Sequence, residues 1–279
     1  MFPELLTLNL PVIGEFTITS FGVMMAIAFL VGYHVIRRQV RETDPGSDLA
    51  SDILLGALVG GIVGAKVYYV LLYWHLTARD PFGMLFARGG LVWYGGLIGG
   101  AIGVIYMARR RGVRLTRVMD ITAPALALSY SIGRIGCFLV GDDYGRPTDS
   151  WVGLAFPKGI PPTTAGDLRR SFGVSIPDSV PDASVLAVHP TQLYEVTLAF
   201  LIFLVLWRLR LQRRAAGWLF AVWMVLAGTE RAFVEIFRAK DDRFFGPLTL
   251  AQVLSLALIG LGLVFMRRLA DSGTEPAAS

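Results

Sequence analysis

The sequence predicts an all-α integral membrane protein with seven transmembrane helices, an external N-terminus, a cytoplasmic C-terminus and a small external cap. Three observations predict this class. Of the 279 residues, 54% are hydrophobic and only 17% are charged. The charges cluster between apolar runs that are about as long as a helix crossing roughly 30 Å of hydrocarbon. Basic residues recur at alternate connections between these runs, which is the pattern of cytoplasmic loops.

Seven apolar runs are expected to be the spans. They cover residues 20–37, 51–74, 91–108, 118–140, 190–208, 216–237 and 248–266. Arginines follow the first, third, fifth and seventh runs: Arg37, Arg38 and Arg41; Arg109, Arg110, Arg111, Arg114 and Arg117; Arg208, Arg210, Arg213 and Arg214; Arg267 and Arg268. The other connections hold less positive charge close to the runs. Because cytoplasmic loops are the ones enriched in Lys and Arg, this asymmetry predicts the orientation of both termini.

Residues 1–270 are expected to form one membrane domain. Within it, the connection 141–189 is rich in Pro, Gly, Ser and Asp and lacks an apolar run, so it is predicted to be an external insert. Residues 271–279 are small and polar and are predicted to be a disordered cytoplasmic tail. The Met1 end shows no secretory signal pattern, because no basic start precedes the first apolar run.

Several classes of partner and cofactor are not expected. A single cysteine, Cys137, excludes an internal disulfide and a multi-cysteine metal site, and it is interpreted as a small core residue. No His, Cys and carboxylate residues stand at metal-ligand spacing, so neither a metal nor an organic cofactor is expected. The net charge of +5 is interpreted as membrane orientation, and no basic-aromatic patch indicates a nucleic acid.

Glycines recur every fourth residue in two predicted spans. Gly56, Gly60 and Gly64 share one face of the second span, and Gly95, Gly99 and Gly103 share one face of the third. This spacing lets helix backbones approach closely in lipid. Helix packing is therefore favoured over a phosphate cradle, although Gly95 and Gly96 can also leave room for a lipid.

Ionisable residues inside or beside apolar runs are the strongest indication of a site. Each costs about 2.5 kcal/mol or more at a helix centre, so it is expected to face a cavity or a partner. They are Lys66, Asp120, Arg134, Glu195, Arg231, Glu235 and Arg238. Arginines near the outer ends of two different spans indicate an anion between them, although Glu235 could satisfy them alone. An anionic headgroup is favoured, because the cations outnumber their obvious carboxylate partners and guanidinium binds phosphate bidentately.

The stretch HPTQLYE, residues 189–195, opens the fifth predicted span at the same outer face. His189, Gln192, Tyr194 and Glu195 place polar groups on more than one side of a helix start, where Pro190 suits the first turn. A structural role and a role in the site are weighted equally for this stretch.

Together these motifs resemble the prolipoprotein diacylglyceryl transferase family. The resemblance rests on seven spans with an external N-terminus and on the stretches GGLIGG, GRIGCFLVGDDYG, HPTQLYE and RAFVEIFR. It runs from about Phe21 to the last span. The fourth-span motif is the most specific, and this chain keeps its Gly133, Arg134, Gly136, Phe138 and Gly145.

The chain departs from the family pattern at five places. In the fourth-span motif, Cys137 and Val140 replace two asparagines and Asp142 replaces a glutamate. Tyr94 stands where the family usually has a histidine, and Phe21-Gly22 stands where Tyr-Gly is common. The fold inference survives these departures, whereas identical chemistry does not automatically follow.

The resemblance implies transfer of a diacylglyceryl group from phosphatidylglycerol to the lipobox cysteine thiol of a prolipoprotein, with release of glycerol phosphate. The implied location is the bacterial cytoplasmic (inner) membrane, and the implied partners are phosphatidylglycerol, lipobox peptides and the lipid bilayer. The expected catalytic residues are Tyr94, Arg134, Arg231 and Glu235. The expected substrate-binding residues are Gly95, Gly96, Asp142, Gly145, His189, Gln192, Tyr194 and Arg238. Arg134 and Arg231 occupy the family's arginine positions, where they would stabilise charge growing on the leaving phosphate.

The role of Tyr94 remains open between three alternatives. The attacking thiol has a free pKa of about 8.5 and must lose its proton, and a neutral phenol is a poor base for that step. Tyr94 could be a phenolate held by Arg134 or Arg231. It could instead position substrate by a hydrogen bond while Glu235, Asp142 or His189 acts as the base, which is the favoured interpretation. The third alternative is a changed activity: a paralogue that uses the same phospholipid site for another acceptor, or a non-catalytic anionic-lipid-binding or transport protein.

Overall fold

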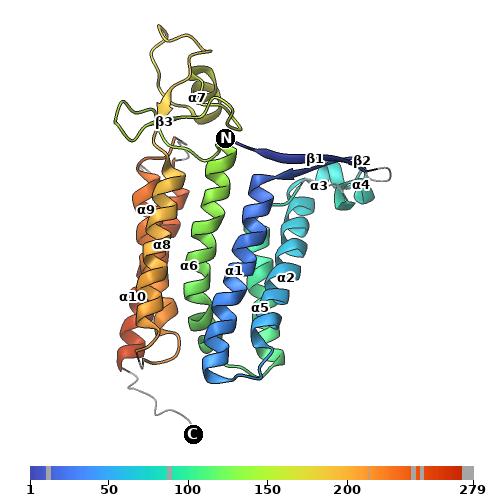
Figure 1. Ribbon diagram of the computed structural model, residues 1–279, viewed down its shortest axis with the longest axis vertical. Helices are drawn as coiled ribbons and strands as arrows, with labels where there is room; N and C mark the ends of the chain where they lie inside the picture. The colour runs from blue at the N-terminus through green and yellow to red at the C-terminus, as the bar shows by residue number, and fades with distance from the viewer. Residues whose placement is uncertain (11–13, 87–89, 213, 240–242, 246–247, 272–279) are drawn as a thin grey trace. The chain divides into compact units, whose positions relative to one another are not determined.

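The computed structural model of the chain describes residues 1–10, 14–86, 90–212, 214–239, 243–245 and 248–271. The chain is mostly helical (Figure 1). By its internal contacts it divides into two compact units. One unit contains residues 1–32 and 122–279, and the other contains residues 33–121. The long helices α1 (Ser20–Thr43) and α6 (Leu115–Val140) each run from one unit into the other.

Helices occupy all seven predicted apolar runs. Besides α1 and α6 they are α2 (Leu49–Leu72), α5 (Trp93–Arg110), α8 (Thr191–Leu209), α9 (Trp218–Glu235) and α10 (Leu250–Asp271). Among the described residues, five of them are long and apolar enough to cross a membrane: α1, α2, α6, α8 and α10. The chain is therefore a helical integral membrane protein.

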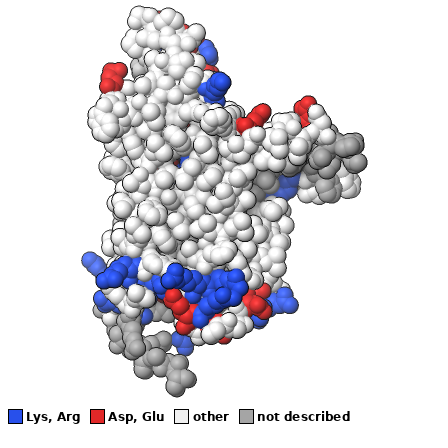
Figure 2. Space-filling model, viewed as in Figure 1, with Lys and Arg blue, Asp and Glu red and all other residues white. Residues whose placement is uncertain are grey.

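Helices α5 and α9 fall outside that set of five for identifiable reasons. Glycines and the terminal pair Arg109 and Arg110 make α5 less apolar. The last two turns of α9 carry Glu230, Arg231 and Glu235. On the face shown in Figure 2, Lys and Arg side chains gather in a band, and the surface beside this band is mostly uncharged.

The expectation of an all-α fold is wrong at the N-terminus. Strands β1 (Glu4–Leu10) and β2 (Gly14–Thr19) form an antiparallel hairpin ahead of α1. Leu6 pairs with Ile18 on one face of the hairpin, and Thr7 pairs with Thr17 on the other. Side chains that alternate between apolar and polar over a few residues are typical of a strand. A search for long apolar runs does not detect this alternation and therefore misses the hairpin.

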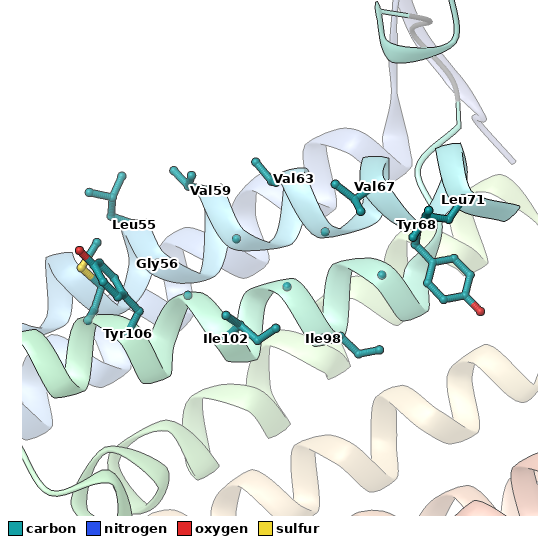
Figure 3. A pocket seen from close by; sticks show the side chains of 16 residues that line it. Leu55, Gly56, Val59, Val63, Val67, Tyr68, Leu71, Ile98, Ile102 and Tyr106 are labelled. Atoms are coloured by element: carbon teal, nitrogen blue, oxygen red, sulfur yellow. The ribbon is translucent and has the colours of Figure 1, made fainter. Parts of the chain in front are cut away.

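In the unit of residues 33–121, α2 and α5 pack through their glycines. A Cβ added to Gly60 would meet the carbonyl oxygen of Gly99, and one added to Gly56 would meet that of Gly103. This confirms the predicted role of the glycines in close helix packing. An apolar groove of about 700 Å³ follows the contact and is lined by Val59, Val63 and Ile102 among others (Figure 3). The short helices α3 (Trp74–Thr77) and α4 (Pro81–Phe86) follow α2.

In the unit of residues 1–32 and 122–279, α8, α9 and α10 pack side by side (Figure 1). A Cβ added to Gly228 of α9 would lie 2.9 Å from the carbonyl oxygen of Ser255 in α10. The buried core includes Ala123, Ala127, Leu206, Leu219 and Val222. Short strands β5 (Arg243–Phe245) and β6 (Leu248–Thr249) join α9 to α10.

The connection 141–189 is a folded element with a core of its own. It contains β3 (Leu154–Ala155), α7 (Ala165–Phe172) and β4 (Ala187–Val188), and β3 pairs with β4. Tyr144, Phe156, Leu168 and Val188 are buried there together with Ala239. Thr164 caps the start of α7 by accepting a hydrogen bond from the Asp167 amide. The predicted tail lies outside the described residues from 272 onward, and so does Arg213 of the predicted basic connections.

Candidate functional site

A buried ion pair joins α6 to α8. Tyr130 and Arg134 stand one turn apart on α6, so both side chains face the same direction. Glu195 of α8 is 0% exposed, and its Oε2 lies 3.0 Å from Nε of Arg134. The Tyr130 hydroxyl donates to the other oxygen of Glu195 at 3.0 Å and accepts from Arg134 Nε at 3.1 Å. Both oxygens of the buried carboxylate are thereby engaged.

Asp143 bridges two arginines from different parts of the fold. Its Oδ2 lies 2.8 Å from Nη1 of Arg134, and its Oδ1 lies 2.6 Å from Nη2 of Arg238. Arg238 follows the end of α9, and its Nε lies 3.8 Å from Oε2 of Glu235. The carboxylate of Asp143 thus connects the end of α6 to the segment after α9.

The third arginine, Arg231, pairs within α9. Its Nη2 lies 2.7 Å from Oε2 of Glu235, one turn further along the helix. Thr249 of β6 donates from its hydroxyl to the other oxygen of Glu235 at 3.0 Å. Nη1 of Arg231 is buried and has no hydrogen-bond partner among the described residues. This guanidinium therefore retains a donor for a further acceptor.

A close backbone crossing at Gly145 holds the ends of these helices together. The Gly145 amide donates to the His189 carbonyl at 2.8 Å, and Gly145 forms an antiparallel bridge with Arg238. A Cβ at Gly145 would lie 2.7 Å from Cβ of His189 and would also meet the Phe237 carbonyl oxygen. Only glycine leaves room for this crossing.

The start of α8 anchors the loop that carries Asp142 and Asp143. Thr191 donates from its hydroxyl to the Asp143 carbonyl at 2.7 Å, and the fully buried Gln192 donates to the Asp142 carbonyl. Asp143 adopts a left-handed backbone conformation with φ of 57°. Nδ1 of His189 lies 3.0 Å from the Tyr194 hydroxyl. Residues of HPTQLYE thus fix the loop after α6 and lie beside Asp142, Asp143 and Gly145.

The charge states of the loop carboxyls differ because their neighbours differ. Burial, together with the adjacent charge of Asp143, raises the pKa of Asp142 to about 6. Burial acts in the same direction on Asp143, but Arg238 and Arg134 outweigh it and lower the pKa of that carboxyl. Burial lowers the pKa of His189. Asp143 is therefore a stable anion, whereas Asp142 titrates close to neutrality.

Most of the predicted site residues lie in one unit. Residues 1–32 and 122–279 contain Arg134, Asp142, Gly145, His189, Gln192, Tyr194, Arg231, Glu235 and Arg238. Tyr94, Gly95 and Gly96 open α5 in the other unit. The Tyr94 side chain is exposed, and its ring packs edge-on against Trp93. Gly95 packs against Gly64 and Tyr68 of α2, which is a helix-packing contact.

The expectation that cations outnumber their carboxylate partners is wrong for the described residues. Each of Arg134, Arg231 and Arg238 pairs with a carboxylate, and Glu195, Asp143 and Glu235 supply them. The motif GDDYG holds two adjacent acids, and sequence spacing singles out Asp142 rather than Asp143. Sequence reasoning also overlooks Tyr130, because a tyrosine attracts no attention in an apolar run.

One group of potential metal ligands occurs among the described residues. Ligand atoms of Cys137, Asp142 and Asp143 lie within 4.8 Å of one another. A cation there would compete with Arg134 and Arg238 for Asp143 and would be repelled by both guanidinium groups. The contacts of Asp143 thus favour its role as an arginine partner.

The molecule is thus an integral membrane protein with a site of paired arginines and carboxylates. This site lies at the ends of apolar helices in the unit of residues 1–32 and 122–279. A family model for prolipoprotein diacylglyceryl transferase matches residues 9–268. The chain belongs to the prolipoprotein diacylglyceryl transferase family.

Curated relatives support this membership. The phosphatidylglycerol–prolipoprotein diacylglyceryl transferase of Bacillus cereus (strain G9842) is 30% identical over 260 residues, which cover 91% of this chain and 88% of that protein. The enzyme of the same name from Bacillus anthracis (strain CDC 684 / NRRL 3495) is also 30% identical over 260 residues, with the same coverage of both chains.

Proposed function

We propose that this protein transfers a diacylglyceryl group from phosphatidylglycerol to the lipobox cysteine thiol of prolipoproteins. The observation that carries the proposal is the family match over residues 9–268. In the reaction, the thiolate sulfur forms a bond to the glycerol carbon of the diacylglyceryl group. The bond from that carbon to the phosphate oxygen breaks, and glycerol phosphate leaves.

Arg134 and Arg231 are assigned to the leaving phosphate, on which negative charge grows during the reaction. Preorganised cations at such a position are among the largest contributions to catalysis. Glu235 and Thr249 hold Arg231 in place, and the buried Nη1 of Arg231 supports an interaction with a phosphate oxygen. Arg238, Gly145, Gln192 and Tyr194 are assigned to substrate binding, together with Gly95 and Gly96 of α5.

Asp142 is the proposed base for the thiol proton. Its Oδ1 is buried without a hydrogen-bond partner among the described residues, and its pKa of about 6 leaves it ionised at neutral pH. A base works best when its pKa lies near the operating pH. Glu235 is held in an ion pair with Arg231 and accepts a hydrogen bond from Thr249, and Nδ1 of His189 is close to the Tyr194 hydroxyl. These contacts favour Asp142 over the other two candidates, with Tyr94 and His189 positioning substrate.

The proposed topology is seven spans in the bacterial inner membrane, with an external N-terminus and residues 141–189 outside. Helices at all seven apolar runs support it, as do arginines at the ends of alternate helices.

Labelling with a membrane-impermeant thiol reagent tests this topology. Two single-cysteine variants are made in a Cys137→Ser background: Trp151→Cys, at an exposed position of the insert, and Ser279→Cys, at the C-terminus. In intact cells, labelling of position 151 alone is expected. Labelling of position 279 alone would invert the topology.

A reconstituted transfer assay tests the function. The protein is mixed with phosphatidylglycerol and a lipobox peptide, and the peptide is expected to gain the mass of one diacylglyceryl group. Arg134→Ala and Arg231→Ala should each reduce transfer at least about 100-fold. Arg170→Ala, which removes an exposed arginine of the insert, is the matched control and should leave transfer unchanged. Normal transfer by both site variants would refute the assignment of the arginines. If the unaltered protein binds phosphatidylglycerol but the peptide gains no mass, the protein uses another acceptor or only binds lipid.

A further inference from the structure

The ion pairs described above form one network of six residues: Arg134, Asp143, Glu195, Arg231, Glu235 and Arg238. Asp143 is its most accessible member. Its side chain is 41% exposed, whereas those of Arg134 and Arg238 are 15% and 11% exposed. The other carboxylates that pair with these arginines, Glu195 and Glu235, are buried. Among the described residues, the exposed partner shared by both arginines is therefore Asp143.

The geometry of the bridge is the geometry that a phosphate would adopt. One oxygen of Asp143 lies 2.8 Å from Arg134, and the other lies 2.6 Å from Arg238. Two oxygens of one phosphate group can bind two guanidinium groups in the same way. A carboxylate and a phosphodiester each carry one negative charge, so exchanging one for the other leaves the balance with the arginines unchanged.

The loop around Asp143 is built so that the side chain can move while the backbone stays in place. Thr191 and Gln192 bind the carbonyl oxygens of Asp143 and Asp142. The carboxylate itself has its described ion pairs only with the two arginines. Rotation about the Cα–Cβ bond would therefore move the carboxylate away from the arginines without breaking the backbone contacts to Thr191 and Gln192.

We propose that Asp143 occupies the phosphate-binding position between Arg134 and Arg238 and is displaced by the phosphate of an anionic lipid headgroup. Asp143 thereby sets the affinity of the site: an anion that cannot replace a carboxylate on two arginines does not bind. This inference rests on the proposed function, because it takes Arg134, which is assigned to the leaving phosphate, and Arg238, which is assigned to substrate binding, as the two residues that hold the phosphate of the bound lipid.

The test measures lipid affinity in Asp143→Asn. The full chain is placed in phosphatidylcholine nanodiscs with increasing fractions of phosphatidylglycerol, and lipid binding is measured by native mass spectrometry alongside transfer to a lipobox peptide. Loss of the competing charge should lower the half-saturating fraction of phosphatidylglycerol about threefold or more. Asparagine also tolerates the left-handed backbone at this position.

A matched control exists in the same insert. Asp182 also bridges two arginines, Arg169 and Arg170, with a side chain that is 56% exposed. Asp182→Asn removes an equivalent charge and should leave the half-saturating fraction unchanged. Asp143→Gly is a second site variant, which removes the carboxylate and accepts a φ of 57°. It should shift the affinity in the same direction as Asp143→Asn.

The outcomes separate this inference from the proposed function. An unchanged half-saturating fraction in both Asp143 variants would overturn the inference. A higher fraction would also overturn it, and it would show that Asp143 organises the arginines for binding. Tighter lipid binding without transfer by any form would support the inference while refuting the transferase reaction. Inorganic phosphate added to pure phosphatidylcholine discs distinguishes a free anion from a lipid, since an affinity gain for inorganic phosphate alone would overturn the headgroup as the displacing ligand.

Discussion

Glu195 of α8 is completely buried, and its Oε2 lies 3.0 Å from Nε of Arg134 in α6. Sequence inspection finds both residues but does not pair them, because a long stretch of chain that includes the folded insert separates them. The pair couples the helix that carries the family's arginine to the helix that opens with HPTQLYE. Its buried position has direct consequences for stability.

Removing the Glu195 charge should destabilise the protein. Glu195→Ala deprives Arg134 of a buried partner and removes the acceptor of the Tyr130 hydroxyl, so a loss of about 3 kcal/mol in the free energy of unfolding is expected. Glu195→Gln keeps an acceptor for Tyr130 and should cost less. Unfolding in detergent, followed by circular dichroism, measures both changes. Equal stability of the Ala variant and the unaltered protein would contradict the pairing.

Asp142 should give stability a measurable pH dependence. Its pKa is about 6 in the folded protein and about 3.9 in an unfolded chain. Between these values the folded protein retains a proton that the unfolded chain has released, so stability should fall as pH rises from about 4 to 6. Thermal unfolding across this range should show a shallower slope for Asp142→Asn.

The carboxyl of Asp143 is the comparison for the pH dependence of stability that is predicted for Asp142. The pKa of Asp143 is lowered, so its contribution is present above the unfolded value and is lost only in more acidic solution. Parallel slopes for Asp142→Asn and the unaltered protein between about pH 4 and 6 would show that Asp142 does not hold the proton. The proposed base would then lose its main support.

Glycine packing between α2 and α5 predicts a contrast between adjacent positions. A Cβ at Gly60 would meet the carbonyl oxygen of Gly99, whereas a Cβ at Gly61 would lie 3.6 Å from that of Gly96, an ordinary contact. Gly60→Ala should therefore reduce stability by about 2 kcal/mol, and Gly61→Ala should stay within about 0.5 kcal/mol of the unaltered protein. The unfolding midpoint in detergent compares them, and equal effects would argue against a tight helix contact.

Tyr94 can be tested by removing its hydroxyl group alone. If Tyr94 positions substrate by a hydrogen bond, Tyr94→Phe should lower transfer by about tenfold, the effect of one lost hydrogen bond of about 1.4 kcal/mol. Tyr94→His restores the residue that the family usually has at this position. It should retain activity if the surrounding site keeps the arrangement that accommodates that histidine. Unchanged kcat in Tyr94→Phe would exclude a role of the hydroxyl group in proton transfer, and an unchanged kcat/KM would also exclude a role in binding.

Helix positions and the membrane class can be read from the sequence, because both depend on local composition. An apolar run of about 20 residues in lipid must satisfy its backbone hydrogen bonds internally, and a helix does so without other parts of the chain. The same locality explains why Gly60 and Gly99 can be recognised as packing positions from their spacing. The N-terminal hairpin escapes such a search, because a period of two over a short strand is a weak signal beside long apolar runs.

The pairing of charges is decided by the tertiary structure. Spacing within GDDYG points to Asp142, but the left-handed backbone at Asp143 and the anchors from Thr191 and Gln192 direct Asp143 to both arginines. Sequence inspection can identify each arginine. It cannot establish which of Glu195, Asp143 and Glu235 pairs with each of them. An ion pair depends on distances of a few ångströms between side chains that are remote in sequence, and only the packing of the helices and the insert brings those side chains together.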